Sequence, residues 1–141
     1  MFRIYSNKRL FLPFFFKIKK INVLLFFVLV GLNCIAQSSK NISLVDKKTF
    51  ATLLKSDKNA QLLDVRTPEE YAESHIDKSK NINWNGNDFV SNLEKLDKTK
   101  AVFVYCKVGG RSKQACEKLA ELGFTEIYNL QGGIINWNKK E

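Results

Sequence analysis

The stretch AVFVYCKVGGRS, residues 101–112, decides the fold. Its first five residues are apolar or aromatic without a break, which predicts a central strand that is covered on both faces. Gly109 and Gly110 allow the backbone to curl tightly before a helix begins near Ser112. In an open parallel sheet, ligands bind where the carboxyl end of a strand runs into such a loop. We therefore expect the functional site at Cys106, where the strand ends.

On either side of this stretch, short apolar runs alternate with amphipathic segments. Further strands are expected at 42–45, 61–65, 81–84 and 126–130. Helices are expected at 46–55, from Thr67-Pro68 onward, after Asp88, from Ser112 to Gly123, and after Gly132-Gly133. About five such alternations predict an α/β domain of three layers, α/β/α, with a central parallel sheet of about five strands.

The loop from Cys106 to Ser112 combines a cysteine, a curled backbone and positive charge. Backbone N–H groups of such a loop, at the N-terminus of a helix, bind anions and stabilise a thiolate. They should lower the pKa of Cys106 below about 8.5, the value of a free cysteine. Cys106 is the candidate catalytic residue. The candidate substrate-binding residues are Lys107, Val108, Gly109, Gly110, Arg111 and Ser112, of which Arg111 and Lys107 add positive charge for an anionic substrate.

Three charged residues near the end of an earlier strand are candidate supporting residues: Asp64, Arg66 and Glu70. They could act on substrate, but we favour an Arg66–Glu70 ion pair that anchors the helix after that strand. Cys116 lies beside the apolar stripe of its helix and is expected in the core.

Residues 1–36 have the pattern of a signal peptide. A basic stretch precedes 12 mostly apolar residues, Ile21 to Leu32, within the roughly 7–15 of a signal-peptide core and short of the 18 or more that span a bilayer. Cleavage is expected after Ala36, followed by a polar linker at 37–41 and the domain at 42–141. This predicts export to the periplasm or the outside of the cell. An uncleaved membrane anchor and lipid attachment at Cys34 stay open, although Asn33 before that cysteine is unusual for a lipoprotein.

The net charge of +9 is concentrated in this leader, which carries six basic and no acidic side chains. The other 105 residues hold 17 basic and 14 acidic side chains, a net of +3 that is ordinary for a small domain. No basic stripe with interleaved aromatics is present, so nucleic acid is not an expected partner. With a single histidine, His75, and no paired cysteines, neither a metal nor another cofactor is expected.

The region from about Ile42 to Trp137 resembles a single rhodanese homology domain. Residues 63–66 (LDVR), with Glu70-Tyr71 and His75-Ile76, resemble the first signature of that family. Residues 105–112 resemble its active loop, and residues 130–134 (LQGGI) with Trp137 resemble its closing element. The chain departs from the pattern at residues 77–79, where Asp-Lys-Ser stands for the usual Pro-Gly-Ala.

The resemblance implies a sulfurtransferase in which Cys106 takes the outer sulfur of thiosulfate, or of another small anionic donor, as a persulfide. Cyanide or a thiol would then accept that sulfur. The main alternative is an exported sulfur-carrier or protein-interaction module with little turnover. A phosphatase of the related cell-cycle type is disfavoured because its loop is one residue longer than Cys106–Arg111. A thiol–disulfide oxidoreductase would need the Cα atoms of Cys106 and Cys116 within about 7 Å.

Overall fold

The computed structural model describes residues 42–140. The expected leader, its cleavage site, the linker and the last residue of the expected domain lie outside the described residues. Within the described part, no helix has the length and apolar character needed to cross a bilayer.

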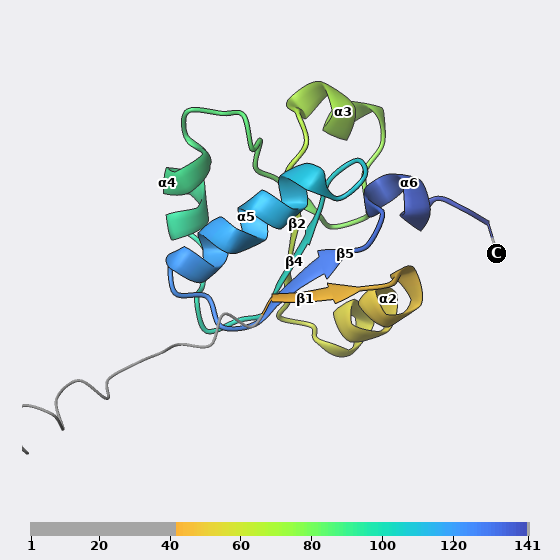
Figure 1. Ribbon diagram of the computed structural model, residues 1–141, viewed down its shortest axis with the longest axis horizontal. Coiled ribbons are helices and arrows are strands. Elements are labelled where there is room, and N and C mark those ends of the chain that lie inside the picture. The colour runs from red at the N-terminus through yellow and green to blue at the C-terminus, as the bar shows by residue number, and fades with distance from the viewer. Residues whose placement is uncertain (1–41, 141) are drawn as a thin grey trace, which may run out of the picture. The chain divides into compact units, whose positions relative to one another are not determined.

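Within residues 42–140, five strands and five helices alternate (Figure 1). The strands are β1 (Ile42–Val45), β2 (Gln61–Asp64), β3 (Lys80–Asn81), β4 (Val102–Tyr105) and β5 (Ile127–Leu130). The helices are α2 (Lys47–Ser56), α3 (Pro68–Glu73), α4 (Phe89–Glu94), α5 (Gly110–Glu121) and α6 (Gly133–Trp137). The α/β class predicted from the sequence is confirmed.

The strands form one parallel sheet in the order β1-β5-β4-β2-β3. All four residues of β4 are buried, as expected of the central strand in the stretch that decides the fold. Because every strand points the same way, the loops that follow them meet at one edge of the sheet, and the loop after β4 is in the middle of that edge.

Alternate residues of β4 contribute to two separate apolar cores, one on each face of the sheet. Val102 and Val104 pack with residues of α4 and α5, including Phe89 and Leu119. On the other face, the aromatic residues of β4 pack with α2 and α6, and the ring centroids of Phe50 and Phe103 are 5.2 Å apart. In Figure 1, α5 and α2 accordingly lie on opposite sides of the sheet. This arrangement gives the three expected layers.

Two helix starts follow directly from the sequence. Asp46 accepts a hydrogen bond from Thr49 N at 2.8 Å and caps α2. Thr67 and Glu70 form a reciprocal capping box on α3, whose first residue is Pro68. Asp88 precedes α4 without capping it, because its carboxylate accepts a hydrogen bond from the Asn92 side chain instead.

The expected strand at 81–84 is shorter than predicted. Only residues 80–81 are strand. The Asn81 side chain donates to the carbonyl groups of Asp64 and Arg66 and ties this short strand to β2. Ile82 N still donates to Asp64 O at 2.9 Å, so the chain continues alongside β2 as irregular backbone.

The departure at residues 77–79 has a visible consequence. Lys78 has φ 62, in the left-handed region, at the position where the resembling family has glycine. A residue with a side chain costs roughly 1–2 kcal/mol there. Buried contacts on either side retain the turn, since Ile76 N donates to the Tyr105 hydroxyl at 3.0 Å and the Ser79 hydroxyl lies 2.9 Å from the same oxygen.

Candidate active site

Cys106 lies directly after β4 and four residues before Gly110, the first residue of α5, so strand and helix together fix its position. Gly109 N donates to the Cys106 sulfur at 3.1 Å. Gly109 can do so because its φ is 112, a conformation that other residues rarely adopt. The Cys106 side chain is covered by this loop, and the residue is only 1% exposed. The loop is therefore a cradle that holds a sulfur atom by its N–H groups.

The balance of burial and hydrogen bonding lowers the pKa of Cys106. Burial alone opposes ionisation, but it is outweighed by hydrogen bonds from the Ser112 side chain and backbone, and from the backbones of Gly109 and Val108. Ser112 is fully buried, and Gly109 O, at 3.1 Å, is the alternative acceptor for its single hydroxyl proton. The expectation of an activated thiol thus has a specific source, the first turn of α5.

The ionisation of Cys106 should be visible in the ultraviolet absorbance of the thiolate. We expect the difference between wild type and Cys106→Ser to titrate with a midpoint below the ordinary pKa of cysteine, so that the thiolate fraction near pH 7 exceeds that of a free cysteine. Ser112→Ala should move this midpoint upward, because the Ser112 side chain is the first of the groups that lower it. An unchanged midpoint in Ser112→Ala would contradict this explanation.

The guanidinium group of Arg111 is already paired and does not offer an unpaired positive charge to the Cys106 sulfur. Its guanidinium forms a two-pronged ion pair with Glu70, with Nη1–Oε2 2.6 Å and Nη2–Oε1 2.9 Å. The favoured Arg66–Glu70 pair is therefore wrong, because Glu70 instead joins α3 to the first turn of α5. This fork geometry matches a guanidinium to a carboxylate and holds the active loop against a second element.

The pair should contribute to stability in a defined pH range. The Arg111 hydrogen bonds lower the pKa of Glu70 from 4.5 to about 2, so the unfolded chain binds more protons between these values and stability falls as the pH falls through them. Glu70→Gln should lose about 1–2 kcal/mol at pH 7, since the pair is partly exposed to solvent. Between pH 4.5 and 2, the stability of Glu70→Gln should also fall less steeply than that of the wild type.

Chemical denaturation as a function of pH measures this effect. Glu69→Gln is the matched control, because Glu69 lies in the same turn but has no contact with Arg111. It should keep the dependence that the Glu70–Arg111 pair causes. Equal pH profiles for Glu70→Gln and wild type would show that the pair does not stabilise the fold.

Asp64 and Arg66 pair with each other instead of reaching the loop. Both are buried, and Arg66 Nη2 lies 2.6 Å from Asp64 Oδ2. The same nitrogen donates to Ser74 O at 2.6 Å, which ties the end of β2 to the residue after α3. Because Asp64 is in register with Tyr105, this pair supports the strand that carries Cys106 from the side.

Gly133, which the sequence placed only at the start of the last expected helix, is a further residue of the site. Ile134 N donates to Cys106 O at 2.9 Å and Ile135 N to Lys107 O at 3.3 Å, so the start of α6 holds the base of the active loop. A Cβ on Gly133 would lie 2.5 Å from Lys107 O and closer still to Cys106 O. The pair of glycines in the sequence was the signal for this close approach.

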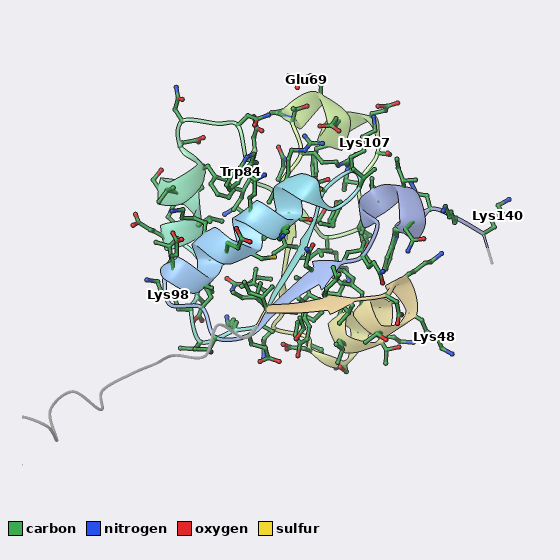
Figure 2. All side chains as sticks on the ribbon, viewed as in Figure 1. Lys48, Glu69, Trp84, Lys98, Lys107 and Lys140 are labelled. Carbon is green, nitrogen blue, oxygen red and sulfur yellow. The ribbon has the colours of Figure 1, made fainter. Side chains whose placement is uncertain are left out.

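The remaining candidates fall on the outer side of the cradle. Lys107 and Val108 are exposed, and Figure 2 shows Lys107 at the end of the molecule where α3 and α6 also lie. Gly110 begins α5.

Cys116 is completely buried in the core, and burial raises its pKa to about 12, so it is not poised to react. Within residues 42–140, no cluster of three metal-ligating side chains occurs.

Comparisons with known proteins identify the family to which these residues belong. Residues 46–140 match the model of the rhodanese-like domain family. A sulfurtransferase of Allochromatium vinosum is 31% identical over 93 residues, which cover 66% of this chain and 85% of that protein. The crystal structure of a rhodanese-like domain protein from Staphylococcus aureus is 28% identical and has a TM-score of 0.61, covering 70% of this chain and 93% of that one.

Some relatives are much longer than this chain. A tRNA uridine(34) hydroxylase of Pelagibacter ubique is 35% identical over 111 residues, which are 78% of this chain but only 36% of that protein. In two other curated relatives the match covers 26% of the protein. The shared region is therefore a domain that occurs within larger proteins as well as alone.

Proposed function

This chain belongs to the rhodanese-like domain family, and from that premise we propose that it is a sulfurtransferase that works through a persulfide on Cys106. The donor is a small anion with a sulfane sulfur, such as thiosulfate, and the acceptor is a thiol or cyanide. Several curated relatives carry the word sulfurtransferase in their names, which supports the general activity.

One observation carries the proposal, namely the hydrogen bond of 3.1 Å from Gly109 N to the Cys106 sulfur at the start of α5. A backbone N–H in this position stabilises negative charge on sulfur both before and after transfer. It favours the thiolate that attacks, and it favours the same thiolate as the leaving group. A buried cysteine with a purely structural role would not need this donor.

In the first half-reaction, the Cys106 thiolate attacks the outer sulfur of thiosulfate. A bond forms between Sγ and that sulfur, the sulfur–sulfur bond of thiosulfate breaks, and sulfite leaves with the electron pair. The enzyme keeps a persulfide, whose terminal sulfur can be held by the N–H groups of the loop. Because Arg111 is paired with Glu70, we assign attraction of the anion to these N–H groups and to the exposed Lys107.

In the second half-reaction, cyanide or a thiolate attacks the terminal sulfur of the persulfide. The bond from that sulfur to Sγ breaks, and Cys106 leaves as the thiolate that Gly109 stabilises. No external oxidant or reductant is needed, since the sulfur atom moves between two nucleophiles at the same oxidation level. A covalent intermediate that separates two half-reactions requires ping-pong kinetics.

Loop size favours sulfur over phosphoryl transfer. Four residues separate Cys106 from Arg111, and they leave the Cys106 side chain nearly covered. A single sulfur atom presented end-on fits such a cradle better than a tetrahedral phosphoryl group. We therefore propose no phosphatase activity, and an aryl phosphate assay should give no phosphate release.

The test is steady-state formation of thiocyanate from thiosulfate and cyanide by the full chain. We expect reciprocal plots at several cyanide concentrations to be parallel, as ping-pong kinetics requires. Intersecting plots would contradict a persulfide intermediate. Absence of thiocyanate from a folded protein would leave the carrier or interaction module as the better account.

A further inference from the structure

A groove runs beside α5 and ends at the active loop. It has a volume of about 520 Å³, and Val108 and Gly109 form the end nearest the sulfur. Ile42 and Leu44 line it from β1, which is an edge strand of the sheet. Since Gly109 also donates to the Cys106 sulfur, the groove begins one residue away from the reacting atom. Nothing in the proposed chemistry so far uses it.

The floor of the groove contains a polar side chain without a partner. Asn129 lies between Leu44 and Val104 in the sheet and is 4% exposed. Its Oδ1 is buried and accepts no hydrogen bond from any described residue. A buried carbonyl group left in this state costs free energy. A half-turn of the Asn129 amide would present this oxygen to the groove, where an N–H group of a bound molecule would remove that cost.

The walls of the groove are apolar and unusually exposed. Leu44 is 62% and Val108 64% exposed, and they belong to the few large apolar side chains of the described chain that solvent reaches. Both would lose contact with water if an apolar group bound between them. Removing these side chains from water would favour binding.

The rim carries two charges of opposite sign. Lys113 and Glu117 lie one turn apart on the same face of α5, and both line the groove. Neither forms an ion pair with another residue of the described chain. A ligand with an ammonium group and a carboxylate would complement both charges.

We propose that this groove binds the sulfur acceptor, and that the acceptor is a short zwitterionic peptide thiol with an apolar side chain. The inference rests on the proposed function and adds the class of acceptor. A peptide N–H would bond to Asn129, the terminal charges would face Lys113 and Glu117, and the apolar side chain would contact Leu44 and Val108. A volume of about 520 Å³ lies within the roughly 300–1,000 Å³ of small-molecule sites.

The transfer step balances without another reactant. The peptide thiolate attacks the terminal sulfur of the Cys106 persulfide, and a new sulfur–sulfur bond forms on the peptide. The bond to Sγ breaks, Cys106 leaves as a thiolate, and the peptide leaves as a persulfide. Cyanide undergoes the analogous attack but is too small to need the groove, which makes it the internal control.

The experiment compares three acceptors after loading with thiosulfate, namely the tripeptides Leu-Cys-Gly and Asp-Cys-Gly with free termini, and cyanide. The variants are Leu44→Asn and Asn129→Leu, with Val90→Asn as the control at an exposed apolar residue of α4 outside the groove. Wild type and Val90→Asn should prefer the leucyl peptide by about tenfold in kcat/KM. Leu44→Asn should lose most of that preference, and both groove variants should use the leucyl peptide about tenfold less well, with cyanide unchanged.

Two results would overturn the proposal. The groove variants could leave peptide transfer unchanged, or they could slow peptide and cyanide alike, which would mean that they act on the loop. If wild type forms no persulfide at all, the proposed function fails instead. The groove can then still be tested by an NMR titration of the full chain with S-methylated Leu-Cys-Gly. Shifts of the Asn129 side-chain amide, absent in Leu44→Asn, are expected, and no shifts in wild type would exclude this ligand.

Discussion

Cys106→Ser is expected to fold and to produce no thiocyanate. The serine hydroxyl can accept the hydrogen bond that Gly109 N gives to the sulfur, so the loop keeps its shape and stability should change by less than about 1 kcal/mol. Transfer should nevertheless fall by at least about a thousandfold, because a neutral hydroxyl neither attacks a sulfane sulfur nor leaves from one at neutral pH. Thiocyanate formation and chemical denaturation measure the two effects separately.

Cys116→Ser is the matched control for this change. Cys116 lies in the same core but is completely buried, and burial raises its pKa to about 12. Its serine variant should keep the turnover of the wild type and lose about 1–3 kcal/mol of stability, because a hydroxyl costs more free energy than a thiol to bury in an apolar core. A folded Cys116→Ser protein without activity would mean that both cysteines take part in the reaction.

Gly133→Ala should have the largest effect on folding. Gly133 has φ 60, and a Cβ there would lie 2.5 Å from Lys107 O, in the backbone of the active loop. The left-handed conformation costs roughly 1–2 kcal/mol and the overlap a further 1–3 kcal/mol, so about 3 kcal/mol should be lost in all. Turnover should fall as well, because α6 would be pushed away from the carbonyl groups that it holds.

Gly123→Ala separates these two contributions. Gly123 also has positive φ, 93, but a Cβ there would meet nothing within 4 Å. We expect a loss of roughly 1 kcal/mol and unchanged turnover. Urea denaturation and thiocyanate formation of both variants provide the comparison. Equal losses at the two positions would show that the contact of Gly133 with the loop does not matter.

Much of the fold could be predicted because the deciding signals are local. The unbroken apolar run before Cys106 required a strand covered on both faces, and β4 is that strand. Thr67, Pro68 and Glu70 specify a helix start by their own side chains, and the capping box is present. The cradle at Cys106 was predictable for the same reason, since Gly109 and the start of α5 are its neighbours in the chain.

Side-chain pairing was harder, because it depends on how separate elements face one another. Asp64, Arg66 and Glu70 lie within seven residues, so an Arg66–Glu70 pair looked reasonable. In the fold, Arg66 folds back onto Asp64, and Glu70 meets an arginine 41 residues further along the chain. No pattern among neighbouring residues indicates a contact between residues so far apart in the chain. The contact of Gly133 with the loop at Cys106 is of the same kind.

The central claim is that Cys106 carries sulfur as a covalent intermediate, and the mass of the intact protein tests it most directly. After incubation with thiosulfate and removal of the excess, the protein should be heavier by one sulfur atom, located on the peptide that contains Cys106. Addition of cyanide should return the original mass. An unchanged mass after thiosulfate treatment, or an added sulfur on Cys116 instead, would contradict this account.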